Sequence, residues 1–115
     1  MTNAQRGEVI LTMGDRQIAG RMTLDTLMRI ESSLGMSIVK AMRLVADGDL
    51  TTAQIIGILL PIVKAGDEHL DESELKKIIW ENGVTEALRE VARVLMQALS
   101  AGDSGGNDLA DEAPQ

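Results

Sequence analysis

Residues able to act as nucleophiles, general bases or metal ligands are scarce in this chain. It contains one histidine, His69, and no cysteine. A zinc site needs several such ligands, and a Ser-His-Asp triad would have to use this same histidine. The one Gly-x-Ser-x-Gly match, Gly102-Asp103-Ser104-Gly105-Gly106, lies in the acidic C-terminal segment and not between a predicted strand and a helix, so no nucleophile elbow is predicted. We therefore interpret His69 as a polar loop residue and predict a protein that is not an enzyme, with no catalytic residues and no metal or cofactor.

Two acidic stretches, Asp47-Gly48-Asp49 and 67–71, do not have the ligand pattern of an EF-hand calcium loop. An EF-hand loop carries a bidentate glutamate at its twelfth position. A loop that started at Asp47 would place Ile58 there, and one that started at Asp67 would place Ile78 there. Both stretches precede predicted helices, where acidic residues serve as caps and as partners of the helix dipole.

The composition indicates one folded domain with an unusual core. The chain has 115 residues, of which 44% are hydrophobic and 25% charged, as in ordinary globular proteins. Trp80 is the only aromatic residue, and there are seven methionines. The core must therefore be built from aliphatic side chains and from methionine, whose flexible thioether adapts to irregular space.

Charge and hydropathy predict where the protein works. The formal net charge is -7, and four acidic residues in the last fifteen supply more than half of it: Asp103, Asp108, Asp111 and Glu112. This charge repels phosphate backbones and argues against nucleic acid as a partner. The longest apolar stretch, Ile55 to Val63, is too short to cross a bilayer, and the chain does not start with a secretory signal. We expect a cytoplasmic protein that binds neither nucleic acid nor membrane.

The elements that must position any site begin with a hairpin. Two β-compatible runs, 8–13 and 16–22, flank Gly14-Asp15, which is typical of a two-residue turn. Alternation places one apolar face on the hairpin, and helices must cover it. Its predicted members are Val9, Leu11, Met13, Ile18 and Met22.

Five helices follow in the predicted order. The first spans 24–34 with Thr23 as N-cap, and the second runs from Ser37 to Gly48. Capping boxes open the third at Thr51 and the fourth at Asp71, and the fifth starts after Thr85 and ends near Ala101. The third helix contains Pro61, which should kink it. The fold class is α+β, mainly α: a flexible 1–6, one domain at 7–101 and a disordered acidic tail at 102–115.

Several apolar side chains are candidates for partner binding, each with a competing core role. Met28, Met36 and Met42 either fill the core or form an adaptable surface. Trp80 is either a core edge or a binding anchor. The third helix is apolar around nearly its whole circumference, so it is either central in the monomer or leaves residues such as Ile62 exposed. The second alternative predicts self-association at high concentration.

The order of these elements resembles that of the small tail-assembly chaperones of gene transfer agents and tailed phages. The resemblance covers nearly all of 6–100 and rests on the order and spacing of short pieces. They are Arg6-Gly7-Glu8-Val9, Thr23-Leu24, Ile30-Glu31, Leu34-Gly35, Leu50-Thr51, Ile55-Ile56-Gly57-Ile58-Leu59, Ala65-Gly66 and Val91-Ala92-Arg93-Val94-Leu95. The chain departs from the family in its acidic tail and in Asp67-Glu68-His69, where a glycine-rich loop is usual.

The resemblance implies a protein made in the bacterial cytoplasm during particle production. Members of the family are thought to coat the long apolar tape-measure protein and to recruit tail-tube subunits, and they carry no catalytic residues. An accessible, adaptable apolar surface on an acidic body suits such a role. The alternative is a small regulatory adaptor that binds a host protein through Trp80 and neighbouring apolar surface.

Overall fold

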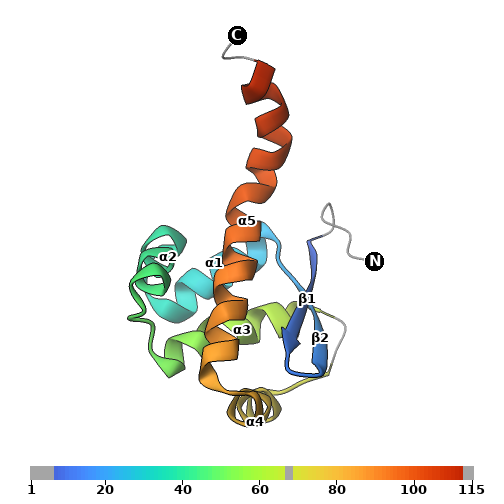
Figure 1. Ribbon diagram of the computed structural model, residues 1–115, viewed down its shortest axis with the longest axis vertical. Helices are drawn as coiled ribbons and strands as arrows, with labels where there is room; N and C mark the ends of the chain where they lie inside the picture. Colours follow the sequence, from blue (N-terminus) through green and yellow to red (C-terminus); the bar gives the residue numbers. More distant parts are fainter. Residues whose placement is uncertain (1–6, 67–68, 113–115) are drawn as a thin grey trace.

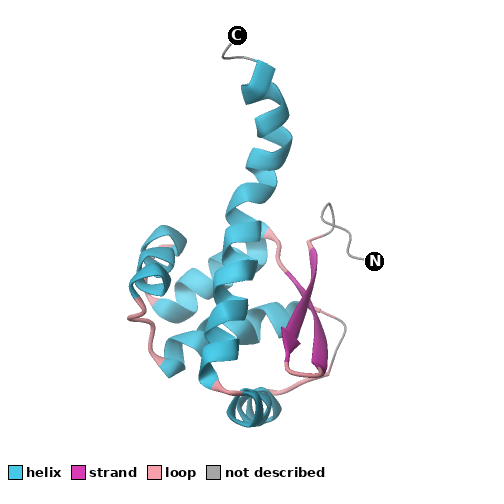
Figure 2. Ribbon diagram, in the orientation of Figure 1, coloured by secondary structure: helices cyan, strands magenta, loops and turns pink. Residues whose placement is uncertain are grey.

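The computed structural model describes residues 7–66 and 69–112, with side chains described as far as Ser100. Within these residues an antiparallel hairpin, β1 (Glu8–Met13) and β2 (Arg16–Arg21), precedes five helices (Figures 1 and 2). The helices are α1 (Leu24–Leu34), α2 (Ile38–Asp47), α3 (Thr52–Ala65), α4 (Glu72–Asn82) and α5 (Val84–Glu112). The predicted fold class is confirmed, and the predicted flexible segment 1–6 lies outside the described residues.

The hairpin has the predicted turn and the predicted buried face. Met13 pairs with Arg16 across the turn, and Gly14 has a φ of 62°, a value that favours glycine. Every second side chain of β1 points into the core. Side chains of β2 on the same face of the hairpin, and that of Met22 directly after β2, do the same. The buried members are Val9, Leu11, Met13, Ile18 and Met22, as the alternation predicts.

Side-chain caps fix the starts of the helices. In α3 the Gln54 amide donates to the Thr51 hydroxyl over 3.1 Å, and Gln54 Oε1 accepts from the Thr51 amide over 2.9 Å. Asp71 and Glu74 form the same reciprocal pair at α4. Each cap satisfies backbone amides that have no partner within the helix, and such a cap contributes about 1 kcal/mol.

Helix α5 differs from its predicted bounds at both ends. The Ala87 amide donates to the Gly83 carbonyl over 3.3 Å, so the helix begins at Val84 and Thr85 is not its N-cap. The backbone is assigned as helix to Glu112, beyond the predicted end near Ala101. Residues 113–115 lie outside the described residues.

Two helices, α3 and α5, form the centre of the molecule. Helix α3 packs on α1, α4, α5 and β2, while α5 packs on α2, α4 and β1 (Figure 1). This position explains why α3 is apolar around most of its circumference. Five of its residues are buried: Ile55, Ile58, Leu59, Ile62 and Val63. No helix in the described part of the chain combines the length and apolar content needed to cross a membrane.

The prediction that Ile62 is an exposed binding residue is wrong. Its side chain is 0% exposed and packs against the hairpin. A Cβ atom placed on Gly20 would lie 2.7 Å from Ile62 Cγ2, so the two elements approach as closely as glycine allows. Hydrophobic pattern alone could not reveal this contact, because β2 lies forty residues earlier in the chain. Helix α3 is central, and only its remaining face is accessible.

Candidate binding groove

The structure separates the residues predicted to bind a partner. Trp80 is 83% exposed on α4, and Met28 is 58% exposed on α1. Met36 and Met42 are half-buried, and Met42 packs against the core. The methionines therefore divide between core and surface and do not form one binding site. The choice left open for Trp80 is decided, since its indole lies on the surface.

Trp80 borders a solvent-open apolar groove, which we call the Trp80 groove. Its volume is about 410 Å³. Helix α3 contributes its first turn and a half, α4 contributes its later turns, and α5 contributes its first residue. The lining residues are Thr52, Ala53, Ile55, Ile56, Lys76, Ile79, Trp80 and Val84. An exposed indole beside an apolar hollow can anchor a partner, because it offers a large apolar area and one N–H donor.

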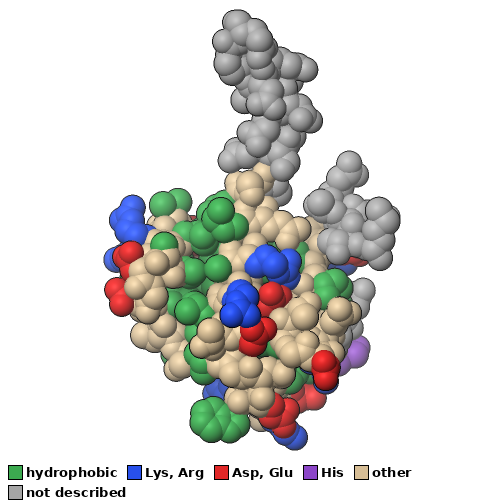
Figure 3. All heavy atoms as spheres, viewed as in Figure 1, with side chains coloured by type: hydrophobic (Ala, Val, Ile, Leu, Met, Phe, Trp, Pro, Cys, Tyr) green, Lys and Arg blue, Asp and Glu red, His purple; other side chains and the backbone are tan. Residues whose placement is uncertain are grey.

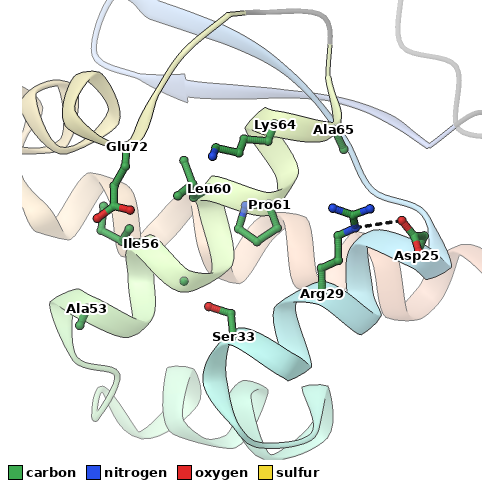
Figure 4. Close-up of a pocket in the computed structure, with 11 residues that line it drawn as sticks. Asp25, Arg29, Ser33, Ala53, Ile56, Leu60, Pro61, Lys64, Ala65 and Glu72 are labelled. Atoms are coloured by element: carbon green, nitrogen blue, oxygen red, sulfur yellow. Dashed lines mark hydrogen bonds and ion pairs between the residues drawn. The ribbon is translucent and has the colours of Figure 1, made fainter.

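A second hollow of about 560 Å³, the α1–α3 hollow, adjoins the Trp80 groove (Figure 4). Both hollows include Ala53 and Ile56 in their linings, so together they follow the accessible face of α3. Gly57, Leu60, Pro61, Lys64 and Ala65 continue this face, while Asp25, Arg29 and Ser33 of α1 and Glu72 of α4 border it. We call the combined surface the α3 groove.

The charges that border the α3 groove are paired, with one exception. Arg29 Nε lies 3.0 Å from Asp25 Oδ2, and Lys76 Nζ lies 2.9 Å from Glu72 Oε2. Lys64, in the last turn of α3, has no hydrogen-bond or ion-pair partner among the described residues. Exposed pairs of this kind contribute little stability. Their effect here is to neutralise the walls and leave a single cation facing the groove.

Within the described chain, the groove holds no cluster of metal-binding groups. No three His, Cys, Asp or Glu side chains come together there in a way that could hold a metal ion. His69 is exposed in the loop before α4, which agrees with its interpretation as a polar loop residue. An apolar floor bordered by charged walls can instead accept an amphipathic helix.

A second exposed apolar surface lies elsewhere. Figure 3 shows hydrophobic side chains gathered over α2 and the neighbouring part of α5. Val39 of α2 and, in the later part of α5, Met96 and Leu99 are exposed. These side chains are aliphatic, whereas the α3 groove has an exposed indole at its border, so the α3 groove is the stronger candidate.

An ion pair between a buried carboxylate and a partly exposed arginine joins α5 to the edge of the hairpin. Glu90 is 7% exposed, and its Oε1 accepts from the Thr12 amide over 2.7 Å. Arg93 donates to Glu90 through Nε and a terminal nitrogen over 3.1 and 2.9 Å, and it also donates to the Ile10 carbonyl. We call this arrangement the edge clamp. It occupies outward-facing backbone groups of β1 that would otherwise be open to another strand.

The edge clamp makes stability depend on pH. Burial by itself raises the pKa of Glu90. Hydrogen bonds from Arg93 and the Thr12 amide, together with the charges of Arg93 and Arg89, lower this pKa by more than burial raises it. The net pKa therefore lies below the ordinary value. A carboxyl whose pKa falls on folding stabilises the native state above its unfolded pKa of about 4.3. This contribution is lost as the pH falls through the folded pKa.

Urea unfolding from pH 7 down to pH 3 is expected to show this loss. The free energy of unfolding of the wild type should fall more steeply below about pH 4.3 than that of Glu90→Gln, which cannot titrate at this position. The two curves should converge towards the acid end. Parallel curves over the whole range would show that Glu90 is not stabilised in its charged form.

Sequence reasoning missed most of the groove, although a signal was present. Positions 53, 56, 57, 60 and 64 recur at helical spacing on one face of α3. That face carries Ala53, Gly57 and the charged Lys64, whereas the buried face carries only large aliphatic residues. The difference in side-chain size and charge between the two faces indicated which one is open.

Comparisons with protein-family models, curated proteins and solved structures match nothing. The fold and the groove therefore define the class of protein. It is a small hairpin-and-helix domain whose central helix exposes one face as an apolar groove between two neighbouring helices.

Proposed function

We propose that this protein is a tail-assembly chaperone of a phage-like or gene-transfer-agent particle. It binds tape-measure and tail-tube proteins in the cytoplasm of the bacterial host cell and catalyses no reaction. The order of sequence pieces that resembles this family supports the proposal. The single observation that carries it is Trp80, which stands 83% exposed beside an apolar groove.

An exposed indole such as that of Trp80 is unfavourable in the free protein. A tryptophan held in water gains none of the stabilisation that burial would supply, and large apolar patches on small proteins mark interaction sites. Tryptophan is also among the residues most enriched at the energetic centres of interfaces. Trp80 therefore fits a contact that is completed only when a partner is bound.

The dimensions of the groove suit a helical partner. Helix α3 has 14 residues, which correspond to about 20 Å of helix axis. A partner helix lying along it would contact the groove over three to four turns, through apolar residues at i, i+3, i+4 and i+7. A tape-measure protein, long and rich in helix, offers many segments of this kind, and covering them would keep it soluble before the tube assembles.

The experiment is co-purification with the product of a long, helix-rich reading frame adjacent to this gene. Trp80→Ala is expected to weaken binding by about 30-fold or more, the loss typical of a central anchor of about 2 kcal/mol. Its melting temperature should stay within a few degrees of the wild type, because the indole is exposed. Titration calorimetry measures the affinity, and circular dichroism the fold.

Met28→Ala is the matched control, because Met28 is also exposed but does not line either hollow. It should bind as the wild type does. A Trp80→Ala variant that retains full affinity would show that the groove is not the binding site. Binding of a host regulatory protein, with no affinity for the adjacent long protein, would favour the adaptor function instead.

A further inference from the structure

Charge selects what the α3 groove can accept. Its floor is apolar, and the charges on its walls are paired with each other, as Asp25 with Arg29 and Glu72 with Lys76. Figure 4 shows Lys64 over the hollow between these walls. A partner without a matching charge would remove the Lys64 ammonium group from water without compensation. A partner with one carboxylate at this point would form an ion pair with Lys64.

We propose that the occupant of the α3 groove is an amphipathic helix that carries a carboxylate at one end of its apolar face, where it pairs with Lys64. The inference rests on the proposed function and specifies the partner's chemistry. A single cation on a protein of net charge -7 suits one carboxylate and not a polyphosphate chain, which requires several cations along its path.

The spacing along α3 fixes where the carboxylate must lie. Lys64 follows Ala53, which lies in the Trp80 groove, by eleven residues, or about 16 Å of helix axis. A partner helix that lies along α3 therefore places its carboxylate about three turns from the apolar side chain that contacts Trp80. A partner sequence of this kind has an acidic residue about eleven positions before or after its apolar anchor, depending on its direction.

The test uses helical peptides of about 20 residues, a length that spans the groove from the apolar anchor at Trp80 to Lys64. Three peptides share one apolar face and differ only at both ends of that face, which carry Glu, Gln or Lys. They contain no aromatic residue, so the fluorescence of Trp80, the only aromatic residue of the protein, reports groove binding directly. Titrations are made at low and at physiological ionic strength.

The wild type is expected to bind the Glu peptide about threefold to fivefold more tightly than the Gln peptide, and the Lys peptide more weakly than both, with the difference reduced by salt. Lys64→Gln should remove the preference, and Lys64→Glu should reverse it. Lys77→Gln is the matched control, since Lys77 is exposed on α4 and lines neither hollow. This variant should keep the wild-type order of affinities.

The outcomes separate this inference from the proposed function. Equal affinities for all three peptides, unchanged in the Lys64 variants, would overturn the carboxylate pairing and leave the groove as a helix-binding site. No change in Trp80 emission with any peptide would overturn both. Sedimentation velocity without peptide is run in parallel, and a wild-type dimer that Trp80→Ala converts to a monomer would identify a second copy of this chain as the occupant and overturn the inference.

Discussion

Replacing Ile62 by aspartate is expected to abolish cooperative folding and to leave a largely unfolded chain. Ile62 is fully buried on the face of α3 that packs against the hairpin, where Gly20 already approaches it as closely as glycine permits. Truncating such a residue to alanine costs about 2–5 kcal/mol. Aspartate adds an unpaired buried charge, which brings the loss close to the whole stability of a small domain, about 5–15 kcal/mol.

Circular dichroism and urea unfolding measure this loss. Ile62→Ala should fold with a midpoint clearly below that of the wild type, and Ile62→Asp should show no cooperative transition. Ile56→Asp is the matched control, because Ile56 lies one and a half turns earlier on α3 but is half-buried in the groove. It should fold and lose partner binding. A folded, stable Ile62→Asp variant would contradict the central position of α3.

Local signals in the sequence were enough to predict most of the elements. The Gly14-Asp15 turn, the two capping boxes and the alternation of the hairpin each involve residues within a few positions of one another, so their geometry is determined locally. The hairpin and the starts of α3 and α4 followed from them, and the single N-caps Thr23 and Ser37 gave the starts of α1 and α2. The boundaries of α5 did not, because a helix can start without a side-chain cap when a glycine carbonyl accepts its first hydrogen bond.

The orientation of α3 depended on contacts that the sequence does not state. An apolar residue lies at nearly every position from 55 to 63, so hydrophobic periodicity gave no preferred face, and only Ala53, Gly57 and Lys64 distinguished the open face by size and charge. The core-facing set was determined by α1, α5 and β2, which come from distant parts of the chain. Trp80 posed the same difficulty, because its exposure follows from the packing of Leu75, Ile78 and Ile79 on the opposite face of α4.

The edge clamp was also beyond local reasoning. Glu90 and Arg93 have the spacing of an ordinary surface ion pair on a helix, like that of Glu86 and Arg89 one turn earlier. What distinguishes the two pairs is that β1, almost eighty residues away in sequence, lies against only one of them. The same three-residue spacing therefore produces an exposed pair at one position and a structural contact at the other.

Because only the Glu90–Arg93 pair contacts β1, Glu90→Ala is expected to destabilise the protein by about 1.5–3 kcal/mol. The variant leaves the Thr12 amide without its acceptor and Arg93 without its buried partner, and hydrogen bonds to charged groups contribute about this much. Arg93 is partly exposed and can turn towards water, which keeps the loss below that of a fully buried unpaired charge. Urea unfolding at pH 7 measures the difference.

Glu86→Ala is the matched control for this prediction and should change the free energy of unfolding by no more than about 0.5 kcal/mol, since Glu86 and Arg89 form an exposed pair of identical spacing. Equal losses for the two variants would show that the contact with β1 contributes nothing. A larger loss for Glu90→Ala should be accompanied by faster amide exchange at Thr12, because that amide is the group the carboxylate protects. Slow exchange at Thr12 in a destabilised variant would place the effect elsewhere in α5.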